Sequence, residues 1–145
     1  AYNDTKQYPL AITACNSALK INPKDGETYF YLARAYDLSG RTAEATRNYS
    51  LAVKGLAEAA KADPTNSDTM YLLGNAYFSD NQRDRAVEAY NKCLELHPRF
   101  AKARLNLGRT LVLKKDKAGA LVQYNELLKI DQKRAAQLKA DIDKL

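Results

Sequence analysis

Histidine occurs once in the 145 residues, as His97, and cysteine occurs only twice. A single imidazole without cysteine or carboxylate neighbours at ligand spacing does not make a metal site. It also leaves a Ser–His–Asp arrangement without a readable base. The six glycines are scattered singly, so no glycine-rich loop is available to cradle a phosphate. We therefore expect no catalytic residues, no metal and no cofactor.

Long apolar runs are also missing. None approaches the roughly 18 residues of a membrane-spanning helix, and no leader with an apolar core follows Ala1. We expect no membrane span and no signal peptide, in a chain that is a mature or excised fragment. Cys15 and Cys93 are predicted to be buried free thiols, which says nothing firm about the redox compartment. The localisation stays open between the cytoplasm and a bacterial cell envelope.

Charge is unevenly distributed, although the formal net charge is only +6. Residues 99–145 contain 12 Lys/Arg and 5 Asp/Glu, a balance of +7, whereas residues 1–98 contain 11 and 12, a balance of −1. A basic end can attract an acidic partner over a distance. Because its lysines are spread around the predicted helices, solvated helix faces are the preferred interpretation.

The stretch 67–98 has the pattern of a helix, a turn and a second helix. In its first half, apolar residues recur at the spacing of one helical face, namely Met70, Leu73 and Tyr77. Gly74 interrupts that helix at a cost of about 1 kcal/mol relative to alanine. This cost is tolerable where a neighbouring helix comes closer than a side chain would allow, and Tyr90 is expected to fill the gap. Pro98 ends the second helix.

The pattern recurs along the chain. A forward shift of 34 residues finds it at Leu107, Gly108, Ala120 and Tyr124. A backward shift of 41 finds it at Leu32, Ala33, Tyr36, Ala45 and Tyr49. This L-G-x2-Y … A-x3-Y … P pattern resembles the tetratricopeptide repeat (TPR) family. The resemblance implies an all-α, right-handed solenoid of antiparallel helix pairs, in which the tyrosines at repeat positions 36, 49, 77, 90 and 124 belong to the core.

The repeat register divides a single predicted domain, residues 1–145. Its parts are a partial repeat (1–25), a repeat with an extended second helix (26–66), two further repeats (67–100 and 101–134) and a capping helix (135–145). Seven extra residues keep a helix in phase over about two turns, so the extended helix is predicted to span 42–61. It is either a protruding contact surface or a variation in helix length.

The first predicted helix runs from Tyr8 to about residue 19, and residues 1–7 match only the end of a helix before it. Its inner face consists of Leu10, Ala11, Cys15 and Ala18. In the repeat pattern this face is covered by a preceding helix, which the sequence does not contain. Either upstream residues were removed, which we favour, or another chain covers the face.

In this family, the first helices of successive repeats line a concave groove that binds peptides or partner helices. Tyr71 and Phe78 stand out there, because the packing pattern does not use them and aromatic residues often anchor interfaces. The alternative is that a neighbour covers Tyr71 and that Phe78 folds over a loop. By position, the resemblance assigns nine residues to this partner-binding groove: Tyr31, Arg34, Asp37, Tyr71, Asn75, Phe78, Lys102, Asn106 and Arg109.

Family members that bind chaperone tails grip a terminal carboxylate with a set of lysine, asparagine and arginine side chains. Only Lys102 matches that set here. The remaining positions are occupied by Phe30, Arg34, Leu72 and Asn106. A chaperone-tail function is therefore not expected.

The sequence thus predicts a non-catalytic adaptor that binds a peptide or helix of a partner protein. The first alternative is a self-assembling structural oligomer, joined through the N-terminal helix or the extended helix 42–61. Nucleic-acid binding through the basic C-terminal third is a lesser alternative, which would show strong salt dependence.

Overall fold

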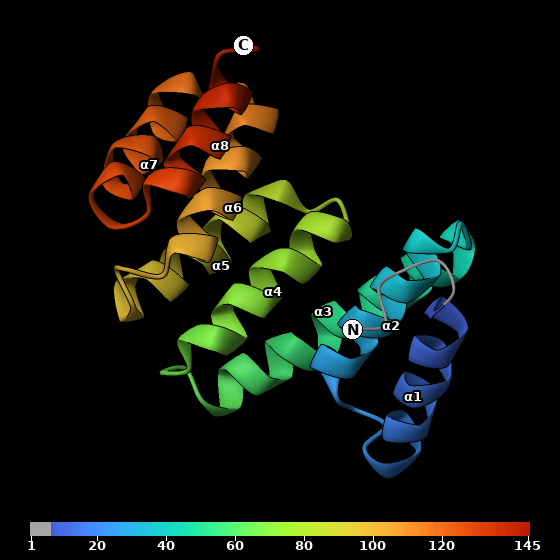
Figure 1. The fold of residues 1–145 in the computed structure, drawn as a ribbon. Coiled ribbons are helices and arrows are strands. Elements are labelled where there is room, and N and C mark those ends of the chain that lie inside the picture. Colours follow the sequence, from blue (N-terminus) through green and yellow to red (C-terminus); the bar gives the residue numbers. More distant parts are fainter. Residues whose placement is uncertain (1–6) are drawn as a thin grey trace. The chain divides into compact units, whose positions relative to one another are not determined.

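The computed structural model describes residues 7–145, and this range contains eight α-helices and no β-strand (Figure 1). The predicted all-α class is confirmed. The predicted end of a helix in residues 1–7 falls largely on residues 1–6, outside the described range. The helices are α1 (Tyr8–Ile21), α2 (Gly26–Leu38), α3 (Thr42–Ala62), α4 (Ser67–Ser79), α5 (Arg83–Leu96), α6 (Ala101–Leu113), α7 (Lys117–Ile130) and α8 (Gln132–Ile142).

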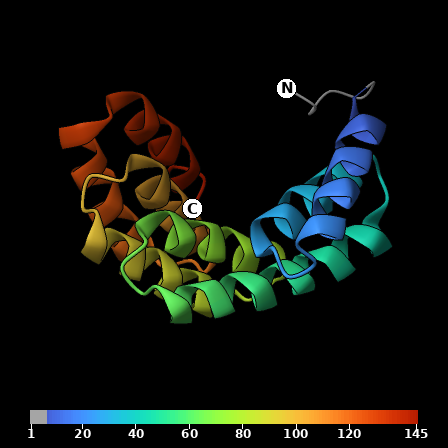
Figure 2. The ribbon, with the colours of Figure 1, turned by 90° about the horizontal axis from the view of Figure 1, so that it is seen from below.

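These helices form two compact units, α1–α3 up to Pro64 and α4–α8 from Thr65 onward. In the first unit α2 packs against both α1 and α3 (Figure 2). Helix α3 has 21 residues, so the seven extra residues do extend a helix. Its length follows from the run of small and helix-forming residues after Tyr49, which contains no proline before Pro64.

A pair of glycines sets the distance between α2 and α3. A Cβ atom on Gly55 would lie 2.7 Å from the Cα atom of Gly26, and a Cβ atom on Gly26 would lie 2.5 Å from the backbone nitrogen of Leu56. The two backbones therefore touch where both residues lack a side chain. The sequence pattern had placed Gly55 only in the extension of α3, without a packing role.

Helix α1 leaves much of its apolar surface open. Tyr8 is its only buried residue, whereas Leu10 is 58% exposed and Ile21 is 89% exposed. Of the predicted inner face, Ala11 and Cys15 are half-buried and Ala18 is exposed. Helix α2 packs against α1 and accounts for the half-buried residues, whereas Leu10 and Ala18 stay exposed within the described residues.

In the second unit, glycines again mark close helix contacts. A Cβ atom on Gly74 would lie 2.5 Å from Cε1 of Tyr90, which confirms that Tyr90 fills the gap beside Gly74. A Cβ atom on Gly108 would lie 2.5 Å from Cδ2 of Leu138, a fully buried residue of α8. The core of this end of the unit consists of Leu105, Ala120, Leu127, Ala135, Leu138 and Ile142.

The repeat tyrosines are less uniform than the pattern predicted. Tyr49 and Tyr90 are buried, at 7% and 1% exposure. Tyr36, Tyr77 and Tyr124 are only half-buried. The Arg41 guanidinium lies over the Tyr36 ring, 4.8 Å from the ring centre, and thus provides part of the cover that this ring has.

Gly74→Ala is expected to lower the free energy of unfolding by about 1–3 kcal/mol, because the added methyl group overpacks the Tyr90 ring. Tyr90 cannot turn aside without losing the hydrogen bond that its hydroxyl donates to Asn75. Urea unfolding measures the change. A control is Ser79→Ala, at an exposed position of the same helix. Equal stability of the two variants would contradict the close contact.

Candidate protein-binding surface

Helices α4, α6 and α8 follow one another along one side of the second unit. Helix α6 contacts both α4 and α8, while α5 and α7 pack behind them (Figure 1). Helix α8 therefore takes the place that the first helix of a further repeat would take. It was predicted as a cap, and it also contributes side chains to the surface that α4 and α6 form.

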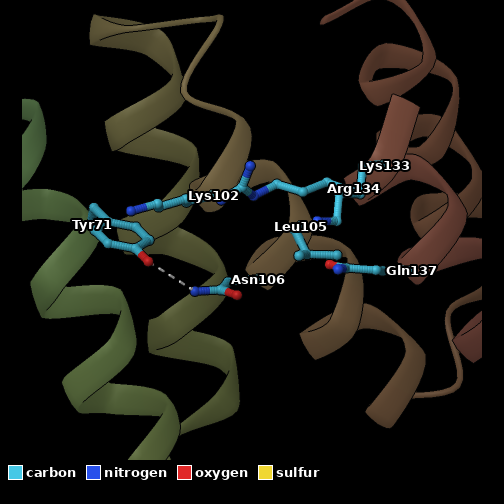
Figure 3. A pocket seen from close by; sticks show the side chains of 7 residues that line it. All are labelled: Tyr71, Lys102, Leu105, Asn106, Lys133, Arg134 and Gln137. Carbon is cyan, nitrogen blue, oxygen red and sulfur yellow. Dashed lines mark hydrogen bonds between the residues drawn. The ribbon is translucent and has the colours of Figure 1, made fainter. Parts of the chain in front are cut away.

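A pocket of about 280 Å³ opens on this surface. Figure 3 shows Tyr71 of α4 on one side, Lys102 and Asn106 of α6 in the middle, and the α8 side chains on the other side. Three of the nine predicted groove residues thus meet at one place. The full lining is Tyr71, Lys102, Leu105, Asn106, Lys133, Arg134 and Gln137.

Tyr71 is partly covered by a neighbour. Its ring centre lies 4.8 Å from that of Phe100, in the turn before α6, and the side chain is half-buried. Its hydroxyl accepts a hydrogen bond of 3.4 Å from Nδ2 of Asn106 (Figure 3). The covered face fixes the ring, and the rest of the side chain lines the pocket.

Asn75 has an internal role. Its Oδ1 accepts hydrogen bonds from the Tyr90 hydroxyl at 2.5 Å and from Nδ2 of Asn106 at 3.0 Å. Burial raises the pKa of Tyr90, so its hydroxyl keeps its proton and remains a donor. This network joins α4, α5 and α6, and it uses the amide groups that the resemblance had assigned to partner binding.

Arg109 and Phe78 lie outside the pocket lining. Nε of Arg109 donates to Oδ2 of Asp141 at 2.9 Å, an ion pair that joins α6 to α8. Phe78 is 36% exposed near the end of α4. Arg109 therefore positions α8, and its guanidinium is already paired.

The remaining predicted residues belong to the first unit. Tyr31, Arg34 and Asp37 are exposed on α2, three residues apart, and therefore share one face of that helix. The Tyr31 ring packs edge-on against Phe30, with ring centres 5.7 Å apart. A role for these three residues in partner binding stays a prediction.

Three pocket residues on α8 were missed, namely Lys133, Arg134 and Gln137. The turn between α5 and α6 contains residues 97–100, whereas a single residue, Asp131, separates α7 from α8. Three residues are thus missing from the last turn, and the repeat shift falls from 34 to 31. At a shift of 31, Lys133 matches Lys102 and Gln137 matches Asn106. This shortened shift is the signal in the sequence that could have found them.

Asp131 fixes the start of α8 beside the pocket. Its Oδ1 accepts from the backbone nitrogen of Arg134 at 3.1 Å, and its Oδ2 accepts from Nη1 of the same residue at 2.5 Å. These bonds, the backbone one first, hold the pKa of Asp131 below its ordinary value. The carboxylate therefore caps the helix and holds the Arg134 guanidinium at the edge of the pocket.

Asp131→Ala is expected to lower the melting temperature and to increase amide hydrogen exchange in the first turn of α8. The matched control is Asp116→Ala, which removes an equivalent cap from α7, where Oδ1 accepts from the Gly119 nitrogen at 2.9 Å. It should loosen α7 only. Because the pKa of Asp131 is lowered on folding, its contribution is complete above the unfolded value of about 3.9 and is lost as the pH falls below it. Unchanged α8 exchange in Asp131→Ala would contradict this role.

The pocket lining is cationic. It contains Lys102, Lys133 and Arg134, and no carboxylate. Arg134 is paired with Asp131, while neither lysine takes part in an ion pair within the described part of the chain. A partly enclosed site of this composition can attract and bind a negatively charged group.

Two models of the tetratricopeptide repeat match the chain, one at residues 38–92 and 71–136 and the other at residues 14–47. The chain belongs to the tetratricopeptide repeat family. Its fold is accordingly an all-α TPR solenoid, and it is a protein-interaction repeat scaffold. Repeats of this family typically act as non-catalytic adaptors.

Solved structures agree with this assignment. MamA (residues 41 to the end) from Desulfovibrio magneticus RS-1 shares 25% identity at a TM-score of 0.64, over 87% of this chain and 67% of that one. Another MamA crystal structure shares 23% identity at a TM-score of 0.56, and the match covers 90% of this chain and 92% of that one. YrrB is described as a TPR protein with an unusual peptide-binding site. It shares 16% identity at a TM-score of 0.55, over 93% of this chain and 84% of that one. No curated protein sequence matches the chain.

Two further findings concern the described residues only. None of their helices combines the length and the apolar character needed to cross a membrane. They also contain no cluster of three His, Cys, Asp or Glu side chains that could hold a metal ion.

Proposed function

We propose that the second unit is an adaptor module that binds a peptide segment of a partner protein on the surface of α4, α6 and α8. The observation that supports this most is the pocket, to which all three helices contribute side chains. YrrB, a protein of the same fold, has a peptide-binding site, which makes a peptide the first class of ligand to test.

The residues that line the pocket also suit a site that binds a ligand without catalysing a reaction. It supplies a fixed aromatic ring, an aliphatic side chain, amides and cations, namely Tyr71, Leu105, Asn106, Gln137 and the three basic residues. It has no histidine, thiol, hydroxyl nucleophile other than the phenol of Tyr71, or carboxylate that could act as a base. The lining therefore supports an adaptor role, in which the two lysines serve as cationic contacts for a ligand.

Selection from a display library of short random peptides tests this function. Peptides enriched on the wild-type protein should bind a double variant, Lys102→Ala with Gln137→Ala, at least about tenfold more weakly. Both side chains are exposed, so their removal leaves the core intact. Tyr71 is avoided as a test position because its ring packs on Phe100.

The matched control is Lys117→Ala with Lys129→Ala, at exposed positions of α7 that do not line the pocket. It should keep the wild-type affinity. Failure to enrich any peptide, or equal binding by the pocket variant and the wild type, would rule out a peptide site at this place.

Self-assembly through α1 is a second candidate, favoured by the open face of that helix. Leu10 and Ile21 are 11 residues apart, about three helical turns, and both are largely exposed on the same face. A second copy of α1 could cover this face. Sedimentation over a concentration series should then show association that Leu10→Lys with Ile21→Lys abolishes. A strict monomer at tens of micromolar would eliminate this candidate.

A further inference from the structure

The pocket holds two ammonium groups from different helices and no carboxylate to neutralise them. Lys102 extends from α6 and Lys133 from α8 (Figure 3), and both side chains are exposed. Nearby acidic groups are used elsewhere, since Asp131 pairs with Arg134 and Asp141 pairs with Arg109. The two lysines therefore bring like charges to one place without an internal partner.

From this arrangement we propose that the pocket receives the carboxylate side chain of a Glu or Asp within the bound peptide, paired with Lys102 and Lys133. The inference rests on the proposed peptide-binding function and specifies its ligand. A carboxylate accepts up to four hydrogen bonds through two oxygens, so it can satisfy ammonium donors from two helices at once.

The remaining polar groups favour an internal side chain over a chain end. A terminal carboxylate is bound best when neighbouring amides also hold the last peptide groups. Here the Nδ2 group of Asn106 already donates to Asn75 and Tyr71, which leaves the lining with the single amide of Gln137. Family members bind a chain terminus with a set of side chains, and Lys102 is the only member of that set present here.

The charge distribution also favours a peptide over a nucleic acid. The pocket gathers its three cations from two helices, α6 and α8, around a volume of about 280 Å³. Lys117 and Lys129 lie on α7, which does not line the pocket. A nucleic acid strand would need a basic track along successive phosphates, whereas this site has room for a few side chains of a bound segment.

Library-selected peptides, made synthetically with a fluorescent label, provide the probe. Replacing the contacting Glu by Gln in the peptide should weaken binding about tenfold, as should Lys133→Gln in the protein. Combining both changes should cost little more than Glu→Gln alone, because the peptide change already removes the ion pair with Lys133. The control Lys129→Gln should leave the affinity unchanged.

Each other outcome has a defined meaning. If peptides bind at the pocket but acidic residues are not enriched and Glu→Gln has no effect, the carboxylate inference fails and the peptide-binding function stands. If no peptide binds, both fail. Loss of binding on amidating the peptide's C-terminus would assign the lysines to a terminal carboxylate and overturn the inference. Displacement of the peptide by a single-stranded oligonucleotide at low salt would overturn it in favour of phosphate recognition.

Discussion

Gly55→Ala should lower the free energy of unfolding by about 3 kcal/mol or more, although alanine is the better helix former by about 1 kcal/mol. The new methyl group would lie 2.7 Å from Cα and 2.8 Å from N of Gly26, and 2.8 Å from the carbonyl oxygen of Lys24. All three are backbone atoms, so no rotation of a side chain can relieve the overlap. Helices α2 and α3 must separate, which opens the core of the first unit.

Urea unfolding followed by circular dichroism measures this change. Hydrogen exchange should locate the loosening in α2 and α3 and leave α6 to α8 protected. Glu58→Ala, at an exposed position of the same helix, is the control, with an expected effect within about 0.5 kcal/mol. A Gly55→Ala protein as stable as the wild type would show that the two backbones are not in contact.

Helix positions could be predicted well because local signals determine them. The first helix was predicted from Tyr8 to about residue 19, and α1 spans Tyr8–Ile21; the extended helix 42–61 differs from α3 by one residue. Apolar spacing sets the buried face of each helix, and Pro23, Pro64 and Pro98 separate successive hairpins. Both signals lie within a few residues of the element that they define.

Packing between distant residues could not be read in the same way. Gly26 and Gly55 touch across 29 positions, and Arg109 pairs with Asp141 across 32. The residue type alone does not indicate whether a glycine lies against another helix or an arginine has a carboxylate partner far along the chain. The role of Gly74 was predictable only because its partner, Tyr90, belongs to the same repeat pattern.

The candidate site shows the same limit. Family position placed Asn75 and Asn106 in the groove, yet both amides are held in a network with Tyr90 and Tyr71. Position within a repeat indicates which way a side chain points. It does not reveal whether neighbouring groups already satisfy its hydrogen bonds, and that decides what remains for a partner. The α8 residues were missed because a turn shortened by three residues breaks the register.

Leu138→Ala should lower the free energy of unfolding by about 2–5 kcal/mol, the usual cost of emptying a fully buried leucine site. Leu138 is 0% exposed, and its methyl groups occupy the space that Gly108 leaves on α6. Glycine cannot extend toward the cavity, so the site collapses poorly and the cost should fall in the upper part of this range. The same contact holds α8 against α6.

The consequence for the pocket distinguishes this variant from a general loss of stability. Loosening α8 displaces Lys133 and Gln137 but leaves Tyr71 and Lys102 on α4 and α6. Hydrogen exchange should therefore rise in α8 well before it rises in α4. The control is Leu128→Ala on α7, where the side chain is already 42% exposed and little is lost on truncation. Equal destabilisation by the two variants would mean that α8 is not anchored through Leu138. The cationic half of the pocket would then depend on the Asp131 cap and the Arg109–Asp141 ion pair.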